Sequence, residues 1–115
     1  MNKIFRWNGA EFKFSALDAD MIERFGAIKQ ETFDELTKYE DKHGLDGTLN
    51  AEGVRAECKI IDRAFDKVLG DGAAKKMFSD ADLHERVAAF NKLVNLREAQ
   101  VESYNRLVES MAGAK

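Results

Sequence analysis

The chain has 115 residues, of which 44% are hydrophobic and 34% are charged, and its formal net charge is −3. This composition is typical of a single globular domain over residues 1–115, and the acidic balance argues against nucleic acid as the main partner. No apolar run reaches the roughly 18 residues of a membrane span. The first residues lack the apolar core of a secretory signal and the single cysteine excludes an internal disulfide, so we expect a cytosolic protein.

The first segment, residues 3–14, predicts a β-hairpin. Asn8-Gly9 stands between two aromatic-rich runs, and this pair best accepts the positive φ angles of a type I′ turn. Aromatic side chains alternate with other residues on both arms, at Phe5, Trp7, Phe12 and Phe14. Such a patch either joins the core or contacts a partner. Trp7 is the candidate for partner contact.

Two helices are predicted next, at residues 17–43 and 50–69, and a short helix follows at 73–77. The absence of proline favours helices throughout. Ser15 or Asp18 can cap the first helix, a loop over 43–49 ends it, and Gly26 inside it indicates a close packing contact. Apolar or semi-apolar residues three or four apart mark one face of each helix: Met21, Phe25, Ile28, Thr32, Leu36 and Tyr39, then Val54, Cys58, Ile61, Phe65 and Val68.

The last predicted helix, residues 80–113, is the longest, with Ser79 or Asp80 as its cap. An unbroken helix over 83–113 would be about 46 Å long, against a diameter of roughly 35 Å for a compact domain of this size. Its end should therefore extend beyond the domain, unless the helix bends back near residues 95–97. Its stripe keeps a four-three spacing at Leu83, Val87, Phe90, Val94, Arg97, Val101, Tyr104, Val108 and Met111, and only Arg97 interrupts it.

These considerations set the expected fold class and the candidate site. We expect a mainly α fold with a small β element, in which an N-terminal β-hairpin packs on a bundle of about three to four helices with a long C-terminal helix. An apolar stripe that extends beyond a domain needs cover from another subunit or a partner protein. The candidate partner-binding residues are Trp7, Val101, Tyr104, Val108 and Met111.

Candidate residues for chemistry are few. His43, Cys58 and His84 match no zinc spacing, and Cys58 lies on an apolar helix face, where a cysteine is usually a small core residue. The acidic segment 41–57 lacks the glycine of a calcium-binding loop, and the glycines at 70 and 72 follow a helix rather than the strand of a phosphate-binding loop. We therefore predict no catalytic, cofactor-binding or metal-binding residues and no enzyme activity.

A basic ridge on the second helix has two interpretations. Arg55, Lys59, Arg63 and Lys67 are four residues apart, so they line one side of that helix. Acidic residues interleave with them, and the local charge is too small for a strong phosphate-binding surface. We expect the ridge to face the acidic first helix; a nucleic-acid contact is the alternative.

The order of these elements resembles a family of small proteins encoded in the tail-gene clusters of phages and prophages of Gram-positive bacteria. The resemblance covers residues 4 to about 100. It is carried by the Asn8-Gly9 hairpin and by the segments LDADMIERF at 17–25, CKIIDRAFDKVLGDG at 58–72, KMF at 76–78 and AFNKLV at 89–94. These small proteins look like tail assembly chaperones in size and genomic setting.

The resemblance implies a role in assembly through protein–protein contacts. Tail assembly chaperones bind the tape measure protein, keep its long helices soluble, help to recruit the major tail protein, and tend to self-associate. The expected partners are therefore phage tail proteins and further copies of the chain, in the bacterial host cytosol, without nucleic acid or membrane. A structural virion component, such as a head–tail or tail adaptor, is the alternative, and a small DNA-binding regulator is a third.

Overall fold

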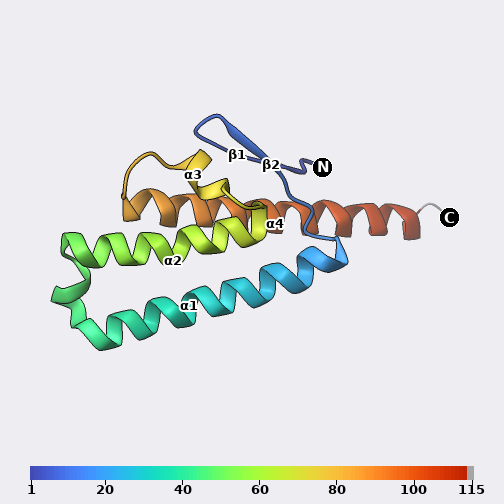
Figure 1. The fold of residues 1–115 in the computed structure, drawn as a ribbon. Coiled ribbons are helices and arrows are strands. Elements are labelled where there is room, and N and C mark those ends of the chain that lie inside the picture. Colours follow the sequence, from blue (N-terminus) through green and yellow to red (C-terminus); the bar gives the residue numbers. More distant parts are fainter. Residues whose placement is uncertain (114–115) are drawn as a thin grey trace.

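The computed structural model describes residues 1–113, without the side chains of residues 45–48. The order of elements is β1 (Ile4–Trp7), β2 (Ala10–Lys13), α1 (Ala19–Thr48), α2 (Ala51–Leu69), α3 (Ala73–Met77) and α4 (Leu83–Gly113). Figure 1 shows α1 and α2 running antiparallel, α4 beside α2, and the hairpin lying over α3 and α4. The expected fold class is confirmed. No helix in the described part of the chain is both long enough and apolar enough to span a membrane.

The hairpin forms as its sequence predicts. The strands pair antiparallel, with Phe5 opposite Phe12 and Trp7 opposite Ala10. Asn8 and Gly9 take φ angles of 49° and 81°, the left-handed values that a type I′ turn requires at both central positions. Because side chains alternate across a strand, Phe5 and its same-face neighbours all pack on the helices, whereas Glu11 stays exposed.

Three polar side chains fasten the hairpin to the helices. The Asn8 Nδ2 donates to the Met77 carbonyl at 2.8 Å and to Glu85 Oε2 at 3.1 Å. Farther along α4, the Lys92 ammonium donates to the Arg6 carbonyl at 2.6 Å. Gln100 then holds both ends of the hairpin, as described below. A two-stranded hairpin is marginal in water by itself, so these contacts and its aromatic face fix its place.

The first two helices begin at side-chain caps. The Met21 amide donates to Asp18 Oδ2 at 3.2 Å, so Asp18 rather than Ser15 caps α1. The Gly53 amide donates to Asn50 Oδ1 at 2.8 Å at the start of α2. Gly44 has a φ of 71° and interrupts the helical backbone of α1 where the sequence predicts its end. The predicted loop over 43–49 also contains residues 45–48, which lie outside the residues whose side chains are described.

The basic ridge of α2 faces α1, as expected. Arg63 Nη2 lies 2.8 Å from Glu35 Oε2, and Lys67 Nζ lies 3.2 Å from Glu31 Oε1. Both pairs are largely exposed, so each contributes at most about 1 kcal/mol. Their spacing of four residues on each helix sets the antiparallel alignment of α1 with α2. The charges of this ridge are thus partly used within the fold.

The core is built around Phe65 of α2. Its ring lies 6.5 Å from that of Phe5, 5.6 Å from that of Phe78 and 5.9 Å from that of Phe90. This one side chain of α2 therefore contacts the hairpin, the residue that follows α3, and α4. Phe90 also stacks on Phe25 of α1 at 6.3 Å. The apolar faces predicted for α1 and α2 are the ones that line this core.

The beginning of α4 differs from the prediction. The helix starts at Leu83, and the Glu85 amide donates to Asp82 Oδ1 at 3.0 Å. Asp82 is therefore the cap, in place of Ser79 or Asp80. Asp80 instead offers its carbonyl to the buried Arg86 guanidinium, which also donates to the Asp82 carbonyl and so ties residues 80–82 to the helix.

The buried face of α4 is also not the face marked by the apolar stripe. The fully buried residues are Arg86, Ala89, Leu93 and Gln100, whereas Val87 is 46% exposed. At about 100° per residue, the stripe from Leu83 to Val101 is centred roughly 100° around the helix from this buried face. Hydrophobicity does not mark the buried face because it contains two polar residues, Arg86 and Gln100, each bonded to distant segments.

Candidate interaction surfaces

The C-terminal part of α4 extends beyond the rest of the molecule. The helix runs unbroken from Leu83 to Gly113, and the molecule measures 60 Å along its longest axis and only 30 and 21 Å across. Every residue from 104 to 113 is exposed. Figure 1 shows this end projecting past the hairpin and the start of α1. The predicted extension is confirmed, and the alternative in which the helix bends near residues 95–97 is wrong.

The exposed end carries an apolar stripe, which we call the overhang stripe and define as Tyr104, Leu107, Val108 and Met111. Their side chains are exposed by 44%, 62%, 42% and 75%, respectively. The spacing of three, one and three residues places all four on one side of the helix. This side continues the buried face that ends at Gln100, so one side of the helix is covered by the fold in its first half and is open and apolar in its second half.

The surroundings of the overhang stripe are uncharged. Ser103, Asn105, Ser110 and Ala112 flank it, and all four are small. The charged residues of the overhang, Glu102, Arg106 and Glu109, lie on the opposite side of the helix by its 100° repeat. Arg106 pairs with Glu102 one turn away, so two of these three charges neutralise each other. A helix or groove can therefore approach the stripe without removing a charge from water.

A second apolar surface is the groove between α1 and α4, which we call the α1–α4 groove. It has a volume of about 520 Å³. Ile61 of α2 belongs to its lining, and Phe33, exposed by 66%, and Val87 are its most exposed apolar members. The complete lining is Gly26, Lys29, Gln30, Thr32, Phe33, Leu36, Ile61, Val87, Phe90 and Asn91.

The α1–α4 groove explains the apolar stripe at the start of α4. Val87 and Phe90 belong to that stripe and both line the groove, and Phe90 also packs on the core through Phe65 and Phe25. Gly26 lies on the opposite wall, and a Cβ added there would meet nothing within 4 Å. The expected close packing contact at Gly26 is therefore absent, and the glycine instead leaves one wall of the groove open.

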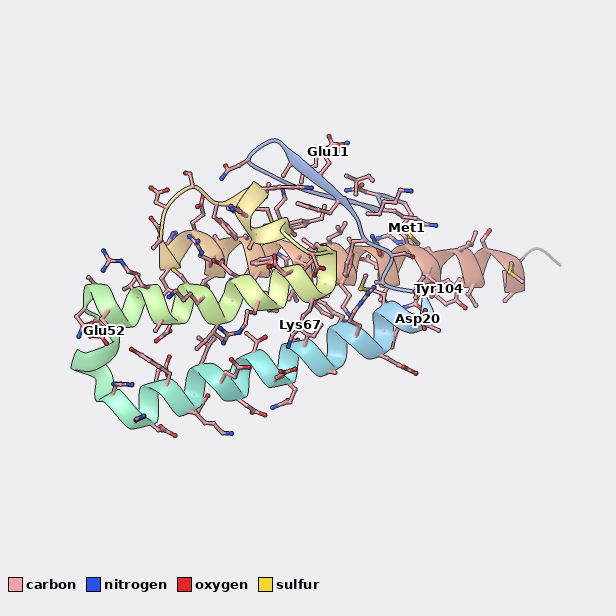
Figure 2. The ribbon with its side chains drawn as sticks, viewed as in Figure 1. Met1, Glu11, Asp20, Glu52, Lys67 and Tyr104 are labelled. Atoms are coloured by element: carbon pink, nitrogen blue, oxygen red, sulfur yellow. The ribbon has the colours of Figure 1, made fainter. Side chains whose placement is uncertain are left out.

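The sequence-predicted partner-binding residues do not form one site. Tyr104, Val108 and Met111 lie together in the overhang stripe, and Val101 is half-buried at its base. Figure 2 shows Tyr104 at the same end of the molecule as Met1 and Asp20. Trp7 is separate: Lys92 Nζ lies 5.6 Å from its ring, and Lys92 precedes Tyr104 by about 18 Å of helix.

Trp7 has mixed surroundings. Its ring is half-buried and packs against the core cluster, in line with the alternative in which the hairpin aromatics join the core. Its indole Nε1 is buried, and no hydrogen-bond partner for it lies among the described residues. Lys92 Nζ lies over the ring in a cation–π contact. Most of the indole is therefore occupied by contacts within the fold.

The residues considered for chemistry lie apart or already have partners. The His43 ring packs on Tyr39 at 4.2 Å, and Cys58 is buried, which raises the pKa of its thiol. In the described part of the chain, no group of three or more histidine, cysteine or acidic side chains is placed to hold a metal ion. The segment 41–57 considered for calcium includes residues 45–48, which lie outside the described side chains.

Amide groups in and after the glycine segment that follows α2 donate hydrogen bonds to nearby residues of the fold. Asp66 Oδ1 accepts the Ala74 amide at 2.9 Å, and the Gly72 carbonyl accepts the Lys76 amide at 3.2 Å. In a phosphate-binding loop such amides point at the anion. Here an internal carboxylate takes the position next to Ala74, so this segment serves to connect α2 with α3.

Comparison with models of protein families gives a match over most of the chain. The model of a family of unknown function, DUF6673, matches residues 8–113. The chain belongs to this family. No curated protein and no solved structure matches it. The DUF6673 match includes α1 and α4 from end to end, so the overhang stripe and the α1–α4 groove both lie within the family region, whereas Trp7 precedes it by one residue.

Two members of these surfaces of the DUF6673 chain are not among the predicted partner-binding residues, although Leu107 widens the apolar stripe of the last helix in the sequence. Leu107 belongs to the overhang stripe, and its position three residues after Tyr104 was the available signal. Phe33 belongs to the α1–α4 groove but falls one position after Thr32, outside the predicted apolar face of α1. A large aromatic residue displaced from the core face of a helix was the signal for a second apolar surface there.

Proposed function

We propose that the chain acts as a tail assembly chaperone-like protein of a phage or prophage, in the cytosol of the bacterial host. It works by protein–protein contact and without catalysis. It binds the tape measure protein, and through it the major tail protein, during assembly. Its copies also associate with one another. The support comes from the resemblance of residues 4 to about 100 to proteins of tail-gene clusters and from the exposed apolar surfaces of α4.

The observation that carries this proposal is the overhang stripe. Tyr104, Leu107, Val108 and Met111 follow the spacing with which an amphipathic helix meets another helix or an apolar groove. A tape measure protein offers long helices with apolar faces, which need cover until assembly is complete. The open stripe provides such cover, and its uncharged flanks allow the two helices to approach closely.

The test is co-expression with the tape measure protein of the same tail-gene cluster. We expect the tape measure protein to be soluble and to co-purify with the chain, and to aggregate without it. The double variant Val108→Asp/Met111→Asp places two charges in the stripe and should abolish both effects. The matched control Asn105→Asp/Ser110→Asp adds the same charge beside the stripe and should retain them.

Two results would contradict the proposal. One is a tape measure protein whose solubility does not depend on the chain. The other is stoichiometric presence of the chain in purified virions, which favours a structural component such as a head–tail or tail adaptor. Binding to DNA that weakens steeply with salt would instead support a DNA-binding regulator.

A further inference from the structure

We propose that the Asn8-Gly9 turn is a site of spontaneous deamidation. The anchored hairpin retards the reaction, and the product weakens the attachment of the hairpin to α3 and α4. The reaction needs water as its co-reactant and replaces Asn8 by aspartate or isoaspartate. The inference does not depend on a tape measure protein or on any other partner.

The first step is the pair of residues itself. The side-chain amide of an asparagine can be attacked by the backbone nitrogen of the next residue, because both belong to one chain and a five-membered ring forms. Glycine offers the least hindered nitrogen, since it has no Cβ. Among all the asparagines of the chain, only Asn8 precedes a glycine.

The reaction has two balanced steps. The Gly9 nitrogen loses its proton to hydroxide and attacks Asn8 Cγ; the N–Cγ bond forms, the Cγ–Nδ2 bond breaks, and Nδ2 takes a proton from water and leaves as ammonia. Water then adds to either carbonyl of the succinimide ring and opens it. Opening at one carbonyl gives aspartate, and opening at the other gives isoaspartate, in which the main chain passes through Cγ. Nothing is oxidised or reduced.

The turn is open to water. Asn8 and Gly9 are both exposed, and a Cβ added at Gly9 would meet nothing within 4 Å. The strands pair Trp7 with Ala10, and the hydrogen bond of such a turn joins these two residues and leaves the Gly9 amide out. Hydroxide can therefore reach the nitrogen that must lose its proton.

The anchor of Asn8 opposes the reaction. Ring closure must rotate the side chain and change the backbone angles of this residue. The side chain is held because Nδ2 donates to the Met77 carbonyl at 2.8 Å and to Glu85 Oε2 at 3.1 Å. The backbone is held at a φ of 49° between the two paired strands. The reaction should therefore proceed mainly through the fraction of molecules in which the turn has left the helices.

The product cannot restore the anchor. A carboxylate at position 8 has no proton to donate, and it would face the Glu85 carboxylate and the Met77 carbonyl, which are both acceptors. Charge repulsion and the unpaired carbonyl then favour the detached turn. Isoaspartate also lengthens the main chain between Trp7 and Ala10, which disturbs their pairing. The conversion thus runs in one direction, and it makes later opening of the hairpin easier.

The experiment follows Asn8 in the full chain by peptide mapping with mass spectrometry, together with an assay for released ammonia, at mildly alkaline pH. We expect Asn8 to be the asparagine that converts fastest in urea, and to convert at least about tenfold more slowly in the native chain. Glu85→Ala removes one acceptor of the anchor, so it should speed the native reaction about fivefold and leave the rate in urea unchanged. The control Glu98→Ala, at an exposed position of the same helix, should react like the unmodified chain.

Two further variants test the product. Asn8→Asp should lower the urea midpoint, followed by the fluorescence of Trp7, the single tryptophan, and should speed hydrogen exchange in β1 and β2. The double variant Asn8→Asp/Glu85→Gln should regain part of the loss, because the new amide can donate to the new carboxylate.

Four results would overturn the inference. These are an Asn8 that stays intact in urea, a native chain that converts as fast as the unfolded one, a Glu85→Ala variant that reacts at the native rate, and an Asn8→Asp variant as stable as the unmodified chain.

Discussion

The side chain of Gln100 on α4 donates from Nε2 to the carbonyl of Phe14 at 2.8 Å, where the hairpin leads into α1. The same amide group donates to the Asn2 carbonyl at 2.7 Å and accepts the Ala16 amide at 2.6 Å. Gln100 is 1% exposed, and its bonds to the Phe14 carbonyl and the Ala16 amide are buried. One side chain thus joins the two ends of the hairpin to the helix at the point where the overhang begins.

Replacing Gln100 by leucine should destabilise the fold by about 3 kcal/mol. The volume is nearly kept, but the Phe14 carbonyl and the Ala16 amide lose their partner, and each unsatisfied buried group costs about 1–3 kcal/mol. Urea unfolding followed by Trp7 fluorescence measures the change. The exposed Asn95→Ala on the same helix serves as the control and should keep or slightly raise stability. A leucine variant as stable as the unmodified chain would contradict this account of the hairpin anchor.

Replacing Arg86 by methionine should cost about 3 kcal/mol. The guanidinium is buried; its Nε donates to Asp62 Oδ1 at 3.0 Å and its Nη2 to Asp62 Oδ2 at 3.3 Å, and it stacks over Phe78 at 4.3 Å. Removing it leaves the half-buried Asp62 carboxylate and the Asp80 carbonyl without their partner. Calorimetry should show the loss. Arg97→Met, at an exposed position of the same helix, should change stability by less than about 0.5 kcal/mol.

Replacing Gly26 by alanine should stabilise the free chain by about 1 kcal/mol. The residue lies inside α1 with an ordinary helical backbone, and an added Cβ meets nothing within 4 Å. Thermal unfolding at a concentration where the chain is monomeric gives the value. Gly44→Ala is the contrasting variant: its φ of 71° strains any side chain, so it should be destabilised. Equal effects at the two glycines would contradict the prediction.

Replacing Glu57 by glutamine should raise stability at pH 7 and have no effect near pH 4. Burial raises the pKa of the Glu57 carboxyl above its ordinary value of 4.5, and the Glu40 carboxylate raises it further. The folded chain therefore binds more protons than the unfolded chain between these two pKa values, and its stability falls as the pH rises through that window.

The measurement for Glu57 is the difference in melting temperature between the variant and the unmodified chain from pH 4 to pH 8. The difference should be positive at pH 7 and should vanish at the acidic end, where the carboxyl is already neutral. Glu40→Gln should give a smaller effect of the same sign, because it removes only the secondary cause. Glu98→Gln at an exposed site of α4 should give a difference that does not follow this pattern.

The hairpin and the helices could be predicted because their signals are local. Asn8-Gly9 specifies its turn by backbone preference alone, and the apolar faces of α1 and α2 contain few polar residues. The orientation of α4 could not be predicted, because Arg86 and Gln100 are buried only through bonds to Asp62 and to Asn2, Phe14 and Ala16, which lie far away in sequence. A pattern of hydrophobicity does not show that such a partner exists.

The candidate surfaces were predictable to different degrees. The overhang stripe followed from helix length and spacing, because an apolar face longer than the domain must extend beyond it. The α1–α4 groove did not follow, because it depends on how far α1 and α4 diverge above Ile61. From the sequence, Phe33 is only an isolated aromatic residue on an exposed helix face. Its place in a groove depends on Val87 of α4, which lies on the opposite wall.

Because α4 is one continuous helix, the direction in which the overhang stripe points depends on the number of residues between the core and the stripe. Each residue inserted between Gln100 and Tyr104 would rotate the stripe by about 100° and move it about 1.5 Å outward, without changing a single contact of the core. Four inserted alanines would turn the stripe by about 40° and seven by about −20°, whereas two would turn it to the far side of the helix. If the stripe binds a partner as proposed, the angle between the two molecules would depend on the number of residues before Tyr104, and a short deletion or insertion in this segment would change that angle while the fold stays the same.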